Sequence, residues 1–394
     1  MLTHWQKNRF STGYINFNRT PIPRSQLTIP NFSVTILRMS NPPIFDGHND
    51  TLTHIYRPER GQGRSFYERS DSGQLDLPRA RIGGLGGGVC AIFTPAPAGA
   101  ADGDPFENMT RSSEGYAVTY PGPIDHAYAR GFTLAVLDLA DEIENEGNGR
   151  VAITLNAVDL EQNLDNDVFS MVLGIEGAAA ISPDLSDLRE YYERGVRVLN
   201  PVWSRSNAFG YGVPFRFPSS PDTGPGLTPA GEDLLAACNE LGILFDLAHL
   251  NEKGFWQVAE LSTAPLVSSH TAAHAICPSA RNITDEQIEA IGRSGGLIGL
   301  YYMPGGIRPD GKHENDTALA GIVRHIKHIV DLIGIDYVAL GSDFDGAQMP
   351  YGLADAAALP NLLQVLEDSG YDEDDLAKIC HENWLRVLRA TWRD

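Results

Sequence analysis

Eight short apolar runs, each bounded by turn residues, set the strongest limit on how this 394-residue chain can fold. They are continuous runs of Val, Ile, Leu and small residues rather than alternating apolar and polar positions, which is typical of parallel strands buried on both faces. The predicted strands are Pro43–Gly47, Gly88–Phe93, Met171–Ile175, Val196–Leu199, Ile243–Leu247, Pro265–Ser268, Gly296–Leu300 and Tyr337–Gly341.

Helical patterns lie between most of these runs. The predicted helices include Ala127–Glu144, Ser182–Glu193, Thr228–Leu241, Thr284–Ser294, Thr317–Ile333 and three pieces within 354–392. Alternating strands and helices indicate parallel βα units, and eight of them predict an α/β protein with a closed, TIM-type (β/α)8 barrel. We expect residues 43–394 to form this one catalytic domain. The stretches 51–87, 94–123 and 205–227 show no such pattern and are expected to be long irregular loops at the catalytic rim.

The chain is strongly acidic, with a formal net charge of −21. Such a surface repels phosphate backbones, so we expect no nucleic-acid partner. No run of 18 apolar residues and no tail suited to a lipid anchor is present, so we expect no membrane association. Four widely spaced cysteines without a C-x-x-C pair predict a reduced, cytoplasmic protein.

Residues 1–42 differ from the rest because they contain five basic side chains and no acidic one. They lack the apolar core of a secretory signal. An organelle transit peptide is an alternative, but the Pro-rich residues 21–30 fit an amphipathic targeting helix badly. We predict a basic, poorly structured N-terminal extension.

Side chains that can bind metal ions follow five of the predicted strands. They are His48 and Asp50, Glu176, His249, His270 and Asp343. In a barrel of parallel strands the carboxyl ends meet at one mouth, so these residues are expected to converge. His48 and Asp50 would point to the same side because residues i and i+2 of an extended segment do so.

The first five of these residues supply three imidazoles and two carboxylates. A single catalytic zinc keeps about three protein ligands, so this set suits two ions about 3.5–4 Å apart that share a carboxylate. Nitrogen and oxygen ligands without thiolate favour zinc, with manganese, iron or cobalt as alternatives. The remaining histidines are less suited, since His325 and His328 are expected on an exposed helix face, and His126, His313 and His381 on the surface.

These same residues carry a resemblance that covers nearly all of the chain after the extension. Asp46-Gly-His-Asn-Asp50, Gly174-Ile-Glu-Gly177, Asp246-Leu-Ala-His249, Ser269-His270 with Arg281-Asn282, and Gly341-Ser-Asp-Phe-Asp-Gly346 together resemble the membrane dipeptidase (renal dipeptidase) family of zinc peptidases. The resemblance implies an amidohydrolase-type barrel with two zinc ions that hydrolyses dipeptides, often with a D-residue at the carboxyl end.

The resemblance also implies a role for each residue. His48, Asp50 and Glu176 would bind one zinc, and Glu176, His249 and His270 the other. Asp343 would accept the proton of a hydroxide bridging the metals and deliver it to the leaving amine. Arg281 would bind the terminal carboxylate, which its planar fork suits.

One position departs from the family pattern. Trp203 stands about where the family has a histidine that helps to hold the tetrahedral intermediate. Trp donates one hydrogen bond but cannot carry a proton, so Arg205 or Asn207 would have to substitute. Trp203 and Asn207 are therefore our remaining candidates for substrate binding.

The leading hypothesis is a binuclear zinc dipeptidase whose partner is a small dipeptide, including L-Xaa-D-Xaa. The alternatives are another metal-dependent amidohydrolase, of the lactonase or deaminase type, and an inactive metal-binding barrel. A homodimer is the default expectation for an oligomer.

Overall fold

A computed structural model describes residues 41–57, 63–97, 109–119 and 122–393 of the chain. The predicted N-terminal extension therefore lies, except for residues 41 and 42, outside the described residues.

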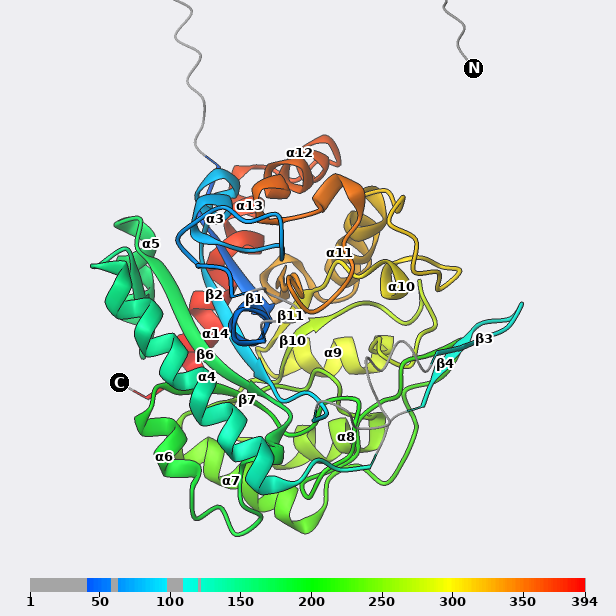
Figure 1. The fold of residues 1–394 in the computed structure, drawn as a ribbon. Coiled ribbons are helices and arrows are strands. Elements are labelled where there is room, and N and C mark those ends of the chain that lie inside the picture. The colour runs from blue at the N-terminus through cyan, green and yellow to red at the C-terminus, as the bar shows by residue number, and fades with distance from the viewer. Residues whose placement is uncertain (1–40, 58–62, 98–108, 120–121, 394) are drawn as a thin grey trace, which may run out of the picture. The chain divides into compact units, whose positions relative to one another are not determined.

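All eight predicted strands are present and run parallel. Figure 1 draws the strands as arrows, with helices around them. They are β1 (Ile44–Asn49), β2 (Leu85–Phe93), β6 (Phe169–Glu176), β7 (Val196–Asn200), β9 (Leu244–Phe245), β10 (Val267–Thr271), β11 (Leu297–Leu300) and β12 (Val338–Leu340). One ladder joins β1, β2, β6, β7 and β9 in that order, and a second joins β10, β11 and β12. A short strand, β5 (Val151–Ile153), pairs with the start of β6.

The two ladders meet at two seams, where each contact is a single parallel bridge. Asp246 pairs with Val267 between β9 and β10, and Asn49 pairs with Phe344 between β12 and β1. The Leu247 amide donates to the Val267 carbonyl, and the Asp50 amide to the Phe344 carbonyl, each over 2.8 Å. These bridges close the eight strands into the predicted (β/α)8 barrel.

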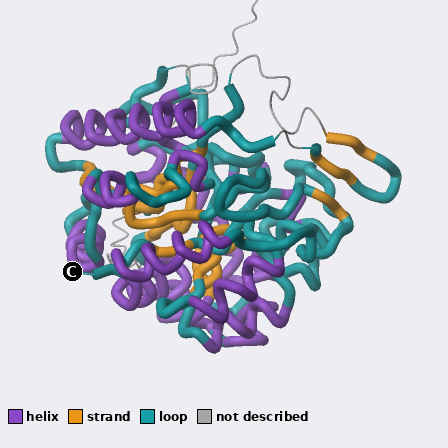
Figure 2. The backbone as a smooth tube through the Cα atoms, turned by 90° about the horizontal axis from the view of Figure 1, so that it is seen from below, coloured by secondary structure: helices purple, strands orange, loops and turns teal. Residues whose placement is uncertain are grey.

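Helices surround the strands, as Figure 2 shows in purple and orange. The longer ones are α4 (His126–Gly147), α5 (Ala157–Asp165), α7 (Pro229–Leu241), α8 (Glu252–Leu261), α9 (Asp285–Arg293), α11 (Ala320–Ile333), α12 (Leu359–Asp368) and α14 (Asn383–Thr391). The short ones are α1 (Thr51–Tyr56), α3 (Leu77–Gly83), α6 (Leu188–Glu193), α10 (Pro304–Ile307), α13 (Glu373–Ala377), the 3-10 turns η2 (Ala178–Ala180), η3 (Ile335–Tyr337), η4 (Tyr351–Leu353) and η5 (Ala356–Ala358), and the π-turn η6 (Lys378–Glu382).

Local chemistry explains where several helices begin and end. The Thr228 hydroxyl accepts the Gly231 amide at the start of α7, and Thr284 forms a reciprocal capping box with Gln287 in α9. The predicted start of α6 at Ser182 was wrong, because the helix begins only at Leu188. Leu185 has a left-handed φ of 59°, which interrupts helical geometry before that point.

All three stretches expected to be irregular contain short regular elements that the sequence analysis missed. Residues 51–87 contain α1 and α3. The stretches 94–123 and 205–227 together form a small antiparallel sheet of β3 (Met109–Arg111), β4 (Tyr116–Val118) and β8 (Arg216–Phe217). These elements are too short to show a period in the sequence.

One apolar side chain from each barrel strand contributes to a cluster around Trp384 of α14. Trp384 is fully buried, and its Nε1 donates to the Leu340 carbonyl over 3.0 Å. A Cβ at Gly47 would lie 2.4 Å from the Trp384 ring, so only glycine fits there. The barrel interior is thus a packed core, which leaves the carboxyl ends of the strands for the site.

His325 was predicted on an exposed face, and this was wrong. Its side chain on α11 is fully buried, where Nδ1 accepts the Ala273 amide over 3.1 Å and Nε2 lies 2.9 Å from the Ile307 carbonyl. Because Nδ1 is an acceptor, the proton must lie on Nε2, which donates to Ile307.

None of the described helices has the length and apolar character needed to cross a membrane.

Candidate metal centre

The five predicted ligands come together at the carboxyl ends of four strands. His48 lies in β1 and Asp50 directly after it, Glu176 ends β6, and His270 lies in β10. His249 follows β9 by four residues. All five are at most 8% exposed, so strand ends that are far apart in sequence form one buried cluster.

The Glu176 carboxylate lies at the centre of this cluster. Its Oε1 is 2.9 Å from His249 Nε2 and 3.5 Å from His270 Nε2, while its Oε2 is 3.8 Å from His48 Nε2. Asp50 Oδ2 also lies near His48, 3.7 Å from the same Nε2 atom. One carboxylate therefore presents one oxygen to each of two groups of side chains, which is the geometry of a bridging ligand.

The donor set fits divalent cations. His48 Nε2 and Asp50 Oδ1 are buried and accept or donate no hydrogen bond among the described residues, although buried polar atoms are normally satisfied. His48, Glu176 and His270 place ligand atoms within 4.8 Å of one another, and so do His48, Asp50 and Asp343. The second group includes the residue that we expected to transfer protons.

The pKa values of three site residues, Glu176, Asp343 and His48, are raised. Burial raises the pKa of Glu176 well above its ordinary value, although His48 opposes the shift. Burial also raises the pKa of Asp343 to about 7, with Asp50 adding to the shift. Burial lowers the pKa of His48, but Glu176, Asp50 and Asp343 outweigh it and raise that pKa to about 10. Cations entering the site would displace these protons and neutralise the carboxylates.

Two site residues have strained backbone conformations. His249 has a φ of 70° and Asp343 a φ of 64°, in the left-handed region that favours glycine. Long-range hydrogen bonds hold both: the Val213 amide donates to the His249 carbonyl over 2.8 Å, and the Asp343 amide to the His48 carbonyl over 2.9 Å. Such strain persists where the surrounding structure over-determines the backbone, commonly at functional sites.

A buried aspartate lies at each seam of the barrel and binds the serine that precedes a site residue. Asp246 accepts the Ser269 amide over 2.8 Å and the Ser269 hydroxyl, and that hydroxyl oxygen lies 2.8 Å from His270 Nδ1. At the other seam, Asp46 accepts the Ser342 amide over 2.6 Å and the Ser342 hydroxyl over 2.7 Å. Ser342 directly precedes Asp343, so both aspartates hold site residues in place where the strand ladder is interrupted.

A cavity of about 460 Å³ opens above the cluster. Its floor includes Asp50, Glu176, His249 and Asp343. The side chains of Phe93, Trp203 and Phe215 form an apolar wall. The centre of the Trp203 ring lies 4.8 Å from that of Phe93 and 5.8 Å from that of Phe215. It also lies 5.8 Å from the centre of the His249 ring.

Arg281 lies beside the cluster but is not among the residues that line this cavity. It is 4% exposed, its Nη2 donates to the His270 carbonyl over 2.9 Å, and its guanidinium lies 5.7 Å from the Tyr301 ring centre. Burial lowers the pKa of Arg281. The guanidinium keeps further donors beyond the one that it gives to His270.

Asn207 uses its side chain within its own loop. Its Nδ2 donates to the Pro201 carbonyl over 2.8 Å, and its Oδ1 accepts the Phe209 amide over 2.8 Å. Arg205 donates to the Thr94 carbonyl over 3.0 Å, with its guanidinium 5.6 Å from the Trp203 ring centre. These contacts fix the loop that carries Trp203.

Several residues that line the cavity were missed by the sequence analysis. His313, expected on the surface, lies in the cavity wall with its ring 5.0 Å from Tyr116. Met109 and Arg111 of β3 and Gln74 also line it. They come from the stretches treated as irregular, and no sequence signal could place them, because the fold of those loops decides which side chains face inward.

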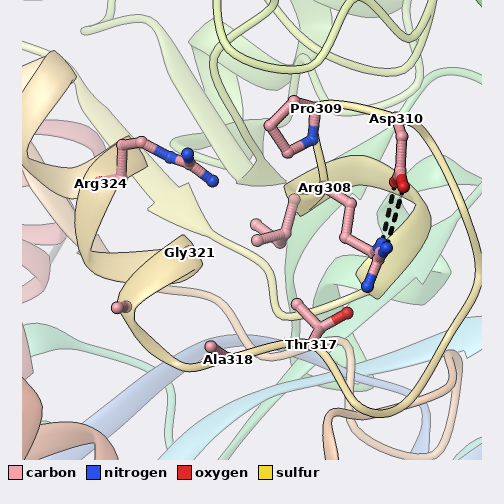
Figure 3. Close-up of a pocket in the computed structure, with 9 residues that line it drawn as sticks. Arg308, Pro309, Asp310, Thr317, Ala318, Gly321 and Arg324 are labelled. Atoms are coloured by element: carbon pink, nitrogen blue, oxygen red, sulfur yellow. Dashed lines mark hydrogen bonds and ion pairs between the residues drawn. The ribbon is translucent and has the colours of Figure 1, made fainter.

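A second hollow, of about 530 Å³, is larger but chemically unsuited (Figure 3). It lies between the start of α11 and the loop after α10. Its carboxylate, Asp310, is paired with Arg308 over 2.8 Å, as the dashed lines show. No histidine lines the hollow, so it lacks the ligand set found in the cavity above Glu176.

Comparison with known proteins agrees with this geometry. The profile of the membrane dipeptidase family, peptidase family M19, matches residues 36–393. Dipeptidase aclJ from Aspergillus oryzae is 30% identical over 361 residues, which are 89% of this chain and 78% of that protein. An uncharacterised protein encoded in the pqqA 5′ region of Klebsiella pneumoniae is 47% identical over 245 residues, 62% of this chain and 90% of that protein.

Solved structures are also similar. A metallopeptidase from Rhodobacter sphaeroides, bound to a phosphinate mimic of the dipeptide L-Ala-D-Ala, is 42% identical with a TM-score of 0.85, covering 89% of this chain and all of that one (100%). A second M19 metallopeptidase, dipeptidase AC, is 42% identical with a TM-score of 0.84, covering 89% of this chain and 99% of that one. The chain therefore belongs to the membrane dipeptidase family, peptidase family M19, and is a metal-dependent dipeptidase.

Proposed function

We propose that this protein is a binuclear zinc dipeptidase whose substrates include L-Xaa-D-Xaa dipeptides. The observation that carries the proposal is the position of Glu176, with one carboxylate oxygen toward His48 and the other toward His249 and His270. The L,D preference is supported by the phosphinate mimic of L-Ala-D-Ala bound to the Rhodobacter sphaeroides relative.

His48, Asp50 and Glu176 would hold one ion, and Glu176, His249 and His270 the other. Bound zinc supplies Lewis acidity, which polarises a peptide carbonyl and makes water a usable nucleophile near neutral pH. The absence of thiolate among these ligands favours zinc over softer ions, and their mixed nitrogen and oxygen donors also accommodate manganese or cobalt.

Asp343 would carry the proton from the nucleophile to the leaving amine. Its carboxylate lies in the cavity floor beside His48 and Asp50. Burial and Asp50 raise its pKa to about 7 in the metal-free protein. A carboxylate within reach of both the nucleophile and the leaving amine can accept a proton from one and donate it to the other.

Arg281 would bind the terminal carboxylate of the dipeptide with the guanidinium donors that His270 leaves unused. Trp203 would form the apolar wall beside the scissile bond. We assign Asn207 to bracing the Trp203 loop, because both ends of its amide are bonded there.

The test combines metal analysis with hydrolysis of paired dipeptides, L-Ala-D-Ala and L-Ala-L-Ala. We expect two zinc ions per chain and turnover of the L,D dipeptide, with turnover lost in Asp343→Asn while both ions remain. Two bound ions without hydrolysis of any dipeptide would refute the proposal.

A further inference from the structure

Arg111 is the one lysine or arginine among the described residues that line the catalytic cavity. The cavity also contains four carboxylates, those of Asp50, Glu176, Asp343 and Asp345. Three of them belong to the metal cluster region. Asp345 is already neutralised, since its Oδ2 accepts Arg64 Nη2 over 2.8 Å.

The side chain of Arg111 has no acidic partner in the part of the chain that the structure describes. Its Nε donates a weak hydrogen bond to the Met109 sulfur over 3.2 Å. Other arginines on the surface find acids: Arg308 pairs with Asp310, and Arg130 with Glu190. In a chain with 51 acidic and 30 basic residues, an exposed arginine that faces a cavity without a carboxylate partner is available for an anionic ligand group.

Its location is set by the small antiparallel sheet. Arg111 pairs across β3 and β4 with Tyr116, and Tyr116 pairs with Phe217 of β8. The Tyr116 ring packs 5.0 Å from His313, which lines the same wall. The sheet therefore holds Arg111 over the cavity from the loops after β2 and β7.

His313, in the same wall, carries no positive charge at neutral pH. Burial lowers its pKa to about 4, and the nearby Arg111 adds to the shift. At neutral pH the imidazole is uncharged, so Arg111 supplies the positive charge on this side of the cavity.

The terminal carboxylate of a simple dipeptide has another proposed partner. The proposed function assigns the terminal carboxylate to Arg281, whose buried side chain donates to the His270 carbonyl. A second carboxylate on the substrate would therefore meet Arg111.

We infer that Arg111 forms a subsite for an acidic side chain, so that the preferred substrates are dipeptides with one Asp or Glu residue. This inference rests on the proposed dipeptidase function. It adds no chemical step, because Arg111 binds the substrate and leaves the reacting atoms to the metal cluster.

The experiment compares isosteric substrates. We would measure kcat/KM for L-Ala-D-Glu against L-Ala-D-Gln, and for L-Glu-D-Ala against L-Gln-D-Ala. The ratio of acid to amide cancels side-chain size and reports the charge alone. For the intact protein we expect a ratio of about 10 or more in one pair, since a partly exposed charge-assisted hydrogen bond contributes on the order of 1.5 kcal/mol.

Arg111→Met should reduce that ratio to about 1, mainly through KM, and Arg111→Glu should bring it below 1. Arg111→Lys keeps the charge and should retain part of the ratio, which distinguishes loss of charge from loss of the hairpin fold. Arg189 on α6 is exposed and is not among the lining residues, so Arg189→Met is the matched control and should keep the intact ratio.

The outcomes separate the two proposals. No hydrolysis of any dipeptide would refute the proposed function. Hydrolysis with equal rates for acid and amide, or an Arg111→Met variant that keeps the preference, would refute only the acidic subsite. An equal loss toward every dipeptide in Arg111→Met would overturn it as well, because Arg111 would then bind the terminal carboxylate.

Discussion

Ser269 connects a buried carboxylate to a proposed metal ligand, and replacing it with alanine tests how the site is held. The Ser269 hydroxyl donates to Asp246 Oδ2. Because its single proton is used there, its oxygen must accept from His270 Nδ1, which lies 2.8 Å away. His270 is then protonated on Nδ1, which leaves the Nε2 lone pair directed toward the Glu176 oxygen 3.5 Å away.

Ser269→Ala removes both hydrogen bonds. Asp246 keeps its bonds from the Ser269 and Ala248 amides, over 2.8 Å and 3.0 Å, but loses the hydroxyl donor. His270 Nδ1–H is left buried without a partner, at a cost of about 1–3 kcal/mol, and the lost bond to a carboxylate costs about 1.5–3 kcal/mol. Because His270 is free to rotate or change tautomer, we expect zinc affinity to fall about 10–100-fold.

The assay is competition with a coloured chelator for zinc, together with urea unfolding of the metal-free protein. Ser268→Ala is the matched control, since Ser268 is fully buried on the same strand and its hydroxyl has no hydrogen-bond partner among the described residues. We expect that variant to bind zinc normally. Ser342→Ala removes the equivalent bond at the other seam and should lower stability without changing the His270 tautomer. If Ser269→Ala lowered stability but left zinc affinity within twofold of the intact protein, the hydroxyl would have no role in orienting His270.

Three further predictions follow from other contacts. Glu176→Gln should bind no more than one zinc per chain by elemental analysis, because an amide oxygen and nitrogen cannot bridge two cations as a carboxylate does; two tightly bound ions would contradict the bridging role. Arg64→Met should lower the free energy of unfolding by about 3–5 kcal/mol in chemical denaturation, because it leaves the fully buried Asp345 carboxylate without its cation. The double variant Arg64→Met with Asp345→Asn should recover part of that loss. Burial lowers the pKa of His325 to about 4, below its value of about 6.5 in the unfolded chain. Its stabilising contribution is therefore present above about pH 6.5 and is lost as the pH falls toward 4. The unfolding free energies of the intact protein and of His325→Gln should differ less at pH 5 than at pH 7.5, and an unchanged difference would contradict the assignment.

The sequence was sufficient to predict the barrel and the convergence of the candidate ligands because both depend on order along the chain. Continuous apolar runs mark strands buried on both faces, and parallel strands place their carboxyl ends at one mouth. His48, Glu176, His249 and His270 each follow or end such a run, so their convergence follows from the fold alone. Helix starts at Thr228 and Thr284 were also predictable, because a cap is made by residues within one turn.

Loop residues were not predictable, because their positions depend on contacts between distant segments. Gln74 lies at the cavity because its backbone N–H donates to the carboxylate of Asp345, 271 residues later. His325 is buried because Ala273 and Ile307 supply its hydrogen-bond partners. Helical spacing alone could not reveal that.

The sequence by itself therefore determined the barrel, its metal-binding chemistry and the family. Only the tertiary structure decided that Glu176 directs one oxygen to His48 and the other to His249 and His270. It also decided that Asp246 and Asp46 bind serines at the seams, and that Arg111 and His313 line the cavity. The physical reason is range: secondary structure and strand-end placement follow from local patterns, whereas the cavity wall is built by loops whose conformations are set by long-range hydrogen bonds and packing.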